Sequence, residues 1–452
     1  MKSAVACVKL GLSDERPIWA GGCPFSGRVR TRRARKGVPG SIPILSSSIA
    51  SMPILAGGQE ERFFDFMQLH PQVQALLQDC IQLRQDLHRI PETGFDLFKT
   101  HAFVMQQLEA CQPDRLETMA TTGIKAVFLA PGARETIALR ADMDGIPTSE
   151  LTEAPYASTH PGSMHGCGHD GHMTMLLLAA RLLQANRDKL TKNVVLLFQP
   201  AEEGKGGARI MIQEGALENP HVDRIYGMHV WPTVTAGKVG VRWGPMMAQT
   251  CEFDMLVHGK SAHGASPQMG VDAIVCAAEL ITVLQTAITR NVDPHQDVLL
   301  TIGKIQGGVA HNVIADEVKL SGTLRVFSPA VYEQLRQRVG SMVQGLSMAT
   351  GAKFEFKELM HYPCVNNPRP LVEDFYTYLD SMEDVELVEP VMAAEDFAYY
   401  QQSIPGLFVF LGIQGGKNQQ PLHNCRFDFD EKNLLVGVEL YARLMGLWGK
   451  EG

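Results

Sequence analysis

Three short apolar runs constrain the fold most, because each is rich in strand-forming residues and ends abruptly in side chains that can do chemistry. They are TIALRAD (136–142), NVVLLFQPAEE (193–203) and RIYGMHV (224–230). Amphipathic helical runs alternate with such segments from about residue 60 onward, which predicts an α/β fold. Ligands of open parallel sheets collect at the carboxyl ends of the strands. We therefore expect the polar ends of these runs to meet at one edge of a mainly parallel sheet.

A different order of elements occupies residues 247–360. Strand-like runs and two long helical runs follow one another there as β-α-β-β-α-β, which is a compact ferredoxin-like unit. The later segments VELVEP, GLFVFLG and LLVGVELYARLMGLW would return to the first sheet. The sequence thus predicts a discontinuous first domain over 60–246 and 361–452, with the ferredoxin-like domain inserted at 247–360.

Residues 1–59 differ from the rest of the chain. They carry nine Lys and Arg residues against Asp14 and Glu15, are rich in Gly, Pro and Ser, and show no sustained helical or strand period. This composition predicts a disordered basic extension. A targeting peptide is an alternative, because the stretch is basic and contains serines. A second alternative is that translation begins at Met52.

The composition argues against several classes of partner. The formal net charge of −8 does not suit the long basic surface that a nucleic-acid binder needs. No run approaches the roughly 18 consecutive apolar residues that span a bilayer. We expect a soluble protein without nucleic-acid or membrane partners. Its nine scattered cysteines contain no Cys-x-x-Cys pair and are not a disulfide framework, which favours a reducing cytoplasm.

The densest group of chemically active side chains is MHGCGHDGH at 164–172. The thiol of Cys167 and the imidazole of His169 are two residues apart, and the glycines beside them allow a tight turn, so both could bind one divalent metal. A buried cysteine and a helix cap at Asp170 explain the same residues about equally well. His172 has a weaker claim and is expected on the following helix.

Glu202 and Glu203 follow an apolar strand in QPAEEG. Adjacent acids on a loop are usually solvated charges. At a strand end, however, neighbouring side chains point in different directions, so one carboxylate could bind metal while the other acts as a general base. His229 in GMHVWP and His423 in PLHNC are lone histidines near proline. Such residues, taken singly, are more often packed or capped than metal-bound.

Asp142 and Asp144 in RADMDGIP stand at the end of the first run. Two aspartates spaced by one residue could bridge metals, or they could accept a hydrogen bond from a ligand histidine and so fix its tautomer. A turn stabilised by Asp side chains before Pro147 is the simpler explanation. We favour the hydrogen-bonding role.

Taken together, the motifs resemble the metal-dependent amidohydrolases that include hippurate hydrolase and the plant auxin-conjugate hydrolases, which are related to aminoacylase and the di-metal carboxypeptidases. The resemblance covers residues from about 70 to 447, and its specificity lies in the order of ten motifs rather than in any one. These motifs are RADMDGIP, PYASxxxGxMHGCGHDGH, QPAEEG, GMHVWP, GKSAHGASPQMGVDA, GGVAHNVIADE, GTLR, AAEDF, PGLFVFLG and PLHNCRFDFDE.

The resemblance implies a site for two divalent metal ions, which could be manganese, zinc, cobalt or nickel. Its ligands would be Cys167, His169, Glu203, His229 and His423, with Glu202 as the catalytic acid and base. The inserted domain would act as a lid that forms a homodimer or homotetramer. Its His263 would reach the substrate carbonyl oxygen, from the partner subunit's lid in related structures. Asn312 and Arg325 would hold the substrate amide or carboxylate.

The predicted reaction is hydrolysis of an N-acyl amino acid, such as a hippurate-like, N-acetyl or aryl-acyl compound, to a carboxylic acid and a free amino acid. A metallo-carboxypeptidase or dipeptidase would use the same metals on a peptide. A non-catalytic metal-holding interaction protein is a third class, but such a protein would be expected to lack Glu202 or one of the ligands, and all of them are present.

Overall fold

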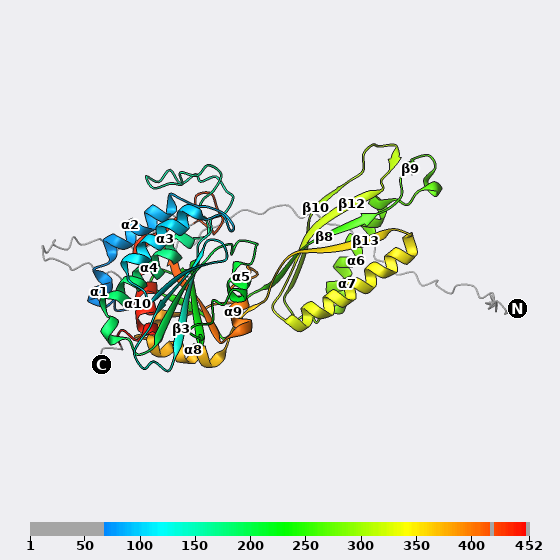
Figure 1. The fold of residues 1–452 in the computed structure, drawn as a ribbon. Helices are drawn as coiled ribbons and strands as arrows, with labels where there is room; N and C mark the ends of the chain where they lie inside the picture. The colour runs from blue at the N-terminus through cyan, green and yellow to red at the C-terminus, as the bar shows by residue number, and fades with distance from the viewer. Residues whose placement is uncertain (1–66, 416–419, 449–452) are drawn as a thin grey trace, which may run out of the picture. The chain divides into compact units, whose positions relative to one another are not determined.

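The computed structural model describes residues 67–415 and 420–448 (Figure 1), so the extension predicted over 1–59 lies outside the described residues. One of its two main sheets has eight strands in the order β1-β2-β4-β3-β5-β16-β6-β15. Helices pack on this sheet, which confirms the α/β class. The strands are β1 (Arg115–Met119), β2 (Gly123–Phe128), β3 (Thr136–Asp142), β4 (Asn193–Gln199), β5 (Arg224–Thr235), β6 (Val239–Val241), β15 (Val385–Leu387) and β16 (Gly406–Gln414).

The centre of this sheet is parallel, as predicted, and its flanks are mixed. β4, β3, β5 and β16 pair in parallel. β1 pairs antiparallel with β2, β2 with β4, and β16 with β6. Only residues 120–122 connect β1 to β2. A parallel pair needs a crossover of about a dozen residues or more, so this connection forces an antiparallel hairpin.

Helices cover both faces of the eight-stranded sheet. Leu196 of β4 joins one buried cluster, and its neighbours Val195 and Leu197 join the other. Successive strand residues face opposite sides, so burial on both sides explains why these strands are continuously apolar. The first cluster includes residues of α2 (Leu77–His88), α3 (Phe98–Ala110), α4 (His169–Ala185), α8 (Arg369–Phe375), α10 (Leu434–Met445) and the short α1 (Pro71–Gln74); the second includes residues of α5 (Gly207–Gln213) and α9 (Ala398–Ser403).

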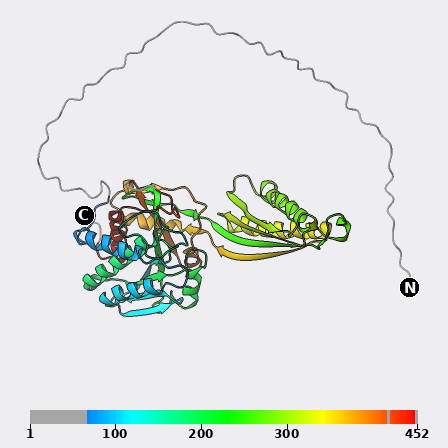
Figure 2. The same cartoon turned by 90° about the horizontal axis from the view of Figure 1, so that it is seen from above.

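The second main sheet is antiparallel throughout, with the strand order β10-β12-β8-β13. Its elements follow the predicted β-α-β-β-α-β order, and α6 and α7 pack together and against its strands (Figure 2). We call this part the inserted unit; its limits as a domain, 247–360, stay a prediction. Its elements are β8 (Gln249–His258), α6 (Ala273–Asn291), β10 (Val298–Gly307), β12 (Glu317–Val326), α7 (Pro329–Thr350) and β13 (Lys353–Tyr362).

Two short strand pairs complete the topology. β9 (Ala262–His263) pairs with β11 (Val313–Ile314), and β7 (Gly244–Met247) pairs with β14 (Val365–Asn367). Among the described helices, α6 alone is long and apolar enough to cross a membrane by length and composition. Its buried face, which includes Leu280 and Leu284, packs against the strands of the inserted unit, whereas Ile274 and Val275 are exposed.

A buried ion-pair cluster ties α2 to α4. Arg84 and Asp170 are both fully buried, and Arg84 Nε lies 2.9 Å from Asp170 Oδ2. Arg84 Nη1 also lies 2.7 Å from Asp428 Oδ1, and His88 Nδ1 lies 2.7 Å from Asp170 Oδ2. Burial alone would raise the pKa of Asp170, but the charges of Arg84 and His88 outweigh burial and hold this pKa well below its usual range. The carboxylate is therefore charged and compensated in the folded protein.

Replacing Arg84 by Met should destabilise the fold by about 3–5 kcal/mol, because Asp170 would keep a buried charge with too little compensation. The low folded pKa of Asp170 contributes stability that is present above its unfolded pKa of about 3.9 and lost as the pH falls through the folded pKa. The deficit of Arg84→Met should therefore be largest near neutral pH and shrink below about pH 4. Denaturant unfolding of both proteins across this range measures it.

Arg181→Met is the matched control, because Arg181 pairs with Asp79 at 2.8 Å on a partly exposed surface. That variant should lose less than about 1 kcal/mol. Equal losses of stability in the two variants would show that the buried cluster stabilises the fold no more than a surface ion pair does.

Candidate metal centre and active site

The three polar strand ends meet, as expected. β3 lies between β4 and β5 and is parallel to both, and Asp142 at its end is in register with Gln199 at the end of β4. The loop with Glu202 and Glu203 begins just after Gln199. His229 lies on β5, two positions beyond Gly227, the last residue of β5 that pairs with β3. Residues from distant parts of the chain therefore leave the sheet at one edge.

A glycine brings the cysteine loop against β5. Gly168 precedes α4 with φ +90°, which favours glycine. A Cβ on Gly168 would lie 2.4 Å from Val230 Cγ2, so only glycine allows this close approach. The helix begins at His169. Asp170 is therefore not the helix cap considered from the sequence, but a residue of the first turn that pairs with Arg84.

Cys167 stands at the centre of the predicted ligands. Its Sγ lies 3.4 Å from His229 Nε2 and 3.3 Å from His423 Nε2. His423 Nε2 in turn lies 3.0 Å from Glu203 Oε1. Cys167, His169 and His229 form one group whose ligand atoms lie within 4.8 Å of one another, and Cys167, Glu203 and His423 form a second. The structure thus brings all five predicted ligands together, with Cys167 common to both groups.

Two of the histidines are oriented by backbone carbonyls. His169 Nδ1 donates to the carbonyl oxygen of Asp144 at 2.7 Å, and His229 Nδ1 donates to that of Val230 at 2.7 Å. A carbonyl can only accept, so in the neutral form that a metal ligand requires, the proton of each ring resides on Nδ1 and the lone pair on Nε2. Within the described residues, the buried Nε2 of His169 has no hydrogen-bond partner. Such an orphaned acceptor fits a metal ligand.

The charges of the site also fit a cation. Burial, followed by the nearby carboxylates of Glu203 and Glu202, raises the pKa of Cys167 well above its usual range. Burial lowers the pKa of His229 well below its usual range, so this imidazole is neutral. A thiol surrounded by carboxylates becomes a thiolate only where a positive charge compensates it, and a divalent ion supplies that charge. The donor set of sulfur, nitrogen and oxygen suits several such ions.

Asp142 orients His172 rather than a predicted ligand. Its Oδ1 accepts from His172 Nδ1 at 2.6 Å, and its Oδ2 accepts from Arg140 at 2.7 Å. His172 Nε2 accepts from the backbone N–H of Val230 at 2.9 Å. Both nitrogens of His172 are therefore engaged, although the ring lies close enough to Asp142 and His169 to form a three-residue group. This explains in physical terms why His172 has the weaker claim as a ligand.

Asp144 organises the glutamate loop. Its carboxylate accepts from the backbone N–H of Glu202 at 3.0 Å and of Glu203 at 3.1 Å. The bond to His169 comes from the backbone carbonyl of Asp144. The hydrogen bond expected between a ligand histidine and the side chain of this aspartate is thus made by its backbone carbonyl, and the side chain holds the glutamate loop instead.

Glu202 is buried beside the ligands, and its surroundings favour the protonated acid. Burial raises its pKa well above the usual range, and the carboxylates of Glu395, Glu203 and Asp396 add to the rise. Its backbone is held by Tyr362, whose hydroxyl donates to the carbonyl oxygen of Glu202 at 2.7 Å. The same oxygen of Tyr362 accepts from the N–H of Gly206 at 2.9 Å. Tyr362 thus closes the loop that carries Glu202.

Sequence reasoning missed Tyr362 and a buried charge cluster around Arg140. Arg140 Nη2 lies 2.9 Å from both Glu395 Oε1 and Asp396 Oδ1, and Nη1 lies 2.7 Å from Asp142 Oδ2. Burial raises the pKa of Glu395 to about 8, although Arg140 opposes the rise. The motif AAEDF signalled the two acids without a role, whereas nothing near Tyr362 in the sequence marked it.

The remaining predicted residues lie in the inserted unit. His263 on β9 is in register with Val313 on β11, and the N–H of Gly264 donates to the carbonyl oxygen of Asn312 at 2.8 Å. His263 and Asn312 are therefore neighbours, both exposed, and neither side chain hydrogen-bonds to the ligand cluster within the described part of the chain. Arg325 on β12 donates to the carbonyl oxygen of Met392.

Known proteins are similar to this chain in sequence. The family model described as Peptidase family M20/M25/M40 matches residues 138–446. IAA-amino acid hydrolase ILR1-like 4 of Arabidopsis thaliana is 35% identical over 418 residues, which cover 90% of this chain and 91% of that protein. N-acetyl-L-cysteine deacetylase of Bacillus subtilis is 38% identical over 367 residues, which cover 80% of this chain and 86% of that protein.

A solved structure agrees with these relatives. The crystal structure of the Bacillus subtilis YXEP protein, a dinuclear metal binding peptidase from the M20 family, matches with a TM-score of 0.69 and 30% identity over 82% of this chain and 99% of that chain. The family match runs from β3 to α10 and includes every residue of the ligand cluster. The resemblance drawn from the ten motifs is confirmed, and the chain belongs to peptidase family M20/M25/M40.

Proposed function

We propose that this protein is a metal-dependent amidohydrolase that cleaves the amide bond of N-acyl amino acids to a carboxylic acid and a free amino acid. The observation that carries this proposal is the cluster in which Cys167 belongs to two ligand groups while the buried Glu202 lies beside them. Two relatives support the substrate class through their names, an IAA-amino acid hydrolase and an N-acetyl-L-cysteine deacetylase. Hippurate-like, N-acetyl and aryl-acyl amino acids are the compounds to test.

Cys167, His169, Glu203, His229 and His423 would hold two divalent ions, with Mn, Zn, Co and Ni as candidates. The related Bacillus subtilis structure is of a dinuclear metal binding protein, and the membership of Cys167 in both groups of possible ligands supports two neighbouring ions. Bound ions lower the pKa of a water and polarise a carbonyl oxygen. His423, whose side chain is 53% exposed, is the ligand most open to solvent among these five, so we propose that ions and substrate enter from its side.

Glu202 is the proposed proton carrier. It would accept a proton from the attacking water and deliver it to the leaving nitrogen, which must be protonated to depart. With no cation beside it, burial keeps the pKa of this carboxyl raised and the group protonated. Divalent ions held by the neighbouring ligands would lower that pKa and leave the carboxylate free to accept the proton. Asp144 and Tyr362 fix the backbone on either side of the Glu202 side chain. The backbone that carries the carboxyl group is therefore held in place while the proton moves.

The inserted unit, proposed as a lid domain over 247–360, would supply the groups that recognise the substrate. His263 would donate to the carbonyl oxygen of a substrate held in the partner subunit, and Asn312 and Arg325 would hold its amide or carboxylate. The exposed positions of His263 on β9 and of Asn312 just before β11 support a role toward another molecule. The remainder, 60–246 and 361–452, would be the catalytic domain of a homodimer or homotetramer.

A reducing cytoplasm is the proposed location. All seven cysteines in the described part of the chain are free thiols, and six of them are buried. Disulfides form and persist mainly in oxidising compartments. A free Cys167 is also the form that the proposed metal site requires.

A metallo-carboxypeptidase or dipeptidase is the second candidate, because the family description names peptidases. Purified protein with its metal content measured should be assayed on N-acetyl amino acids, N-benzoyl amino acids and dipeptides. Faster hydrolysis of the acyl compounds supports the amidohydrolase, and faster hydrolysis of the dipeptides supports the second candidate.

Substituting Glu202 by Gln should lower kcat by about 10²–10⁴-fold, because the proton carrier is removed. Both metals should stay bound, which elemental analysis of the purified variant measures. Glu203→Gln is the matched control in the adjacent position and should lose metal as well as activity. Activity retained in Glu202→Gln would remove this residue from the acid and base role.

Substituting Tyr362 by Phe should lower kcat by about 10- to 100-fold, because misplacement of a catalytic group by about 1 Å can have an effect of this size. The metal content and KM should change little, since the ligands and the substrate-binding groups are untouched. Tyr399→Phe is the control, because the Tyr399 ring lies 6.0 Å from that of Tyr362 and its hydroxyl bonds to His361 instead. An unchanged kcat in Tyr362→Phe would exclude the positioning role.

Substituting His263 by Ala should lower the rate by about 10²–10³-fold, the usual effect of losing one oxyanion donor, without changing the metal content. Mixed dimers of the inactive Glu202→Gln and His263→Ala chains should regain part of the activity if the site is shared between subunits. Mixtures that stay inactive would favour closure of the lid within one chain.

A further inference from the structure

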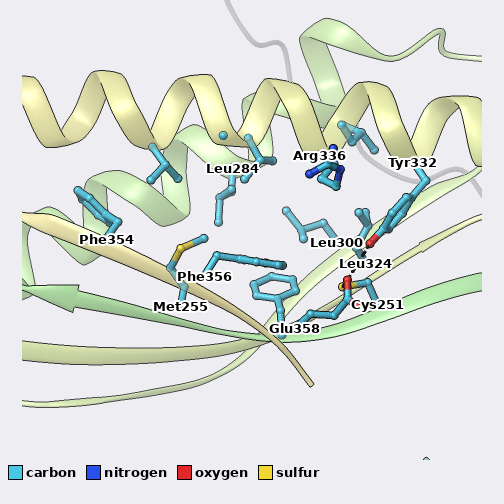
Figure 3. A pocket seen from close by; sticks show the side chains of 15 residues that line it. Cys251, Met255, Leu284, Leu300, Leu324, Tyr332, Arg336, Phe354, Phe356 and Glu358 are labelled. Carbon is cyan, nitrogen blue, oxygen red and sulfur yellow. Dashed lines mark hydrogen bonds between the residues drawn. The ribbon is translucent and has the colours of Figure 1, made fainter. Parts of the chain in front are cut away.

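A cavity of about 320 Å³ lies in the inserted unit, between α7 and the four-stranded sheet, and no role assigned so far uses it (Figure 3). Residues from all four strands and from α6 and α7 line it. The metal ligands lie outside this lining. The cavity is therefore separate from the metal centre, and a molecule bound in it would not have to take part in the reaction performed there.

Side chains of α7 that face the sheet are fully buried only near the start of the helix. Tyr332 and Leu335 are the buried residues of this 22-residue helix. Val339 and Val343 continue the same helical face one and two turns later, yet they are only half-buried and line the cavity. An apolar stripe thus points at the sheet without filling the space below it.

The opposite wall is aromatic. Phe253 on β8 and Phe356 on β13 lie with ring centroids 5.5 Å apart. Phe356 is in register with Met255 of β8, which is buried on the helix-covered face of the sheet. Phe356 lies on the same face, yet it is 50% exposed. Exposed aromatic surface inside a concave site is the usual lining of a small-molecule pocket.

The polar groups of the cavity gather at one end. Tyr332 Oη donates to Glu358 Oε2 across 3.4 Å, and Cys251 Sγ lies 3.8 Å from the same oxygen (Figure 3). Both contacts are long, so the carboxylate keeps acceptor capacity for a further donor. The charge of Arg336 is compensated elsewhere, because its Nε and Nη2 lie 2.8 and 2.9 Å from the carboxylate of Glu333. The polar end therefore offers an acceptor and disfavours an anion.

We propose that this cavity binds a small uncharged aromatic molecule with one hydrogen-bond donor, its ring between Phe253, Phe356 and the α7 stripe and its donor on Glu358. The volume of about 320 Å³ exceeds the roughly 150 Å³ of an apolar cavity that binds benzene. It stands near the lower limit of about 300 Å³ for ligand pockets. One or two fused rings fit within this space.

Indole is the probe, because it is an uncharged two-ring molecule with a single N–H donor. Titration calorimetry of the full-length, metal-loaded protein should show saturable binding of one indole per chain, and thermal unfolding should shift to higher temperature. Benzothiophene has the same shape without the donor and should bind about tenfold more weakly. Absence of saturable indole binding would overturn the proposal.

Two variants locate the site. Val343→Phe fills the cavity and should weaken indole binding by at least about tenfold, whereas Met348→Phe, which adds the same side chain at a position that is 83% exposed on α7, should leave it unchanged. Glu358→Leu should abolish the preference for indole over benzothiophene while both still bind. Indole binding unchanged in Val343→Phe, or a preference that survives Glu358→Leu, would contradict the assignment. If Val343→Phe does not fold, Glu358→Leu still tests the proposal.

Discussion

The parallel pairing of β3 with β4 and β5 is the constraint on which the rest of the structure depends. It places Asp142, the loop of Glu202 and Glu203, and His229 at one sheet edge, although they are distant in sequence. The same pairing creates an electrostatic problem, because several buried carboxylates and a thiol gather where water is largely excluded. Buried charges of one sign are costly unless opposite charges compensate them. The site therefore requires cations, and the chain itself supplies only part of them.

Arg140 supplies the positive charge that the chain itself contributes against these carboxylates. It lies on β3, and its guanidinium contacts Asp142, Glu395 and Asp396 at 2.7–2.9 Å. One positive charge does not balance three carboxylates, and Glu395 accordingly keeps a pKa raised to about 8 by burial. Cys167, Glu202 and Glu203 have no arginine or lysine of their own within the described ion pairs. The acidic groups without an arginine or lysine partner are therefore side chains that offer metal-ligand atoms, and divalent ions would stabilise their charged forms most.

The strands and the inserted β-α-β-β-α-β unit could be predicted because they depend on local patterns: apolar runs with polar ends, and helical periods of sufficient length. The ligands Cys167, His169 and Glu203 needed the order of the motifs as well, since each alone has a bland explanation. Tyr362 and Arg140 could not be assigned roles. Glu202 lies 160 positions from Tyr362, and Asp396 lies 256 positions from Arg140. A buried tyrosine or arginine has no local signal that names such a distant partner. The two hydrogen bonds that occupy the ring nitrogens of His172 could not be predicted either, because they depend on where Asp142 points.

The inserted sheet has two faces with different tasks. Along β12 alternate residues face opposite sides, so Leu324 lines the cavity under α7 while the next residue, Arg325, contacts Met392 on the other side. β8 lies between β12 and β13 and hydrogen-bonds to both, and β13 ends at Tyr362, which holds the backbone of Glu202. A displacement of this sheet would therefore move a proposed substrate-binding arginine and the support of the proposed proton carrier together. A helix-covered antiparallel sheet is suited to this, since packing on one face keeps it rigid and leaves the other face available.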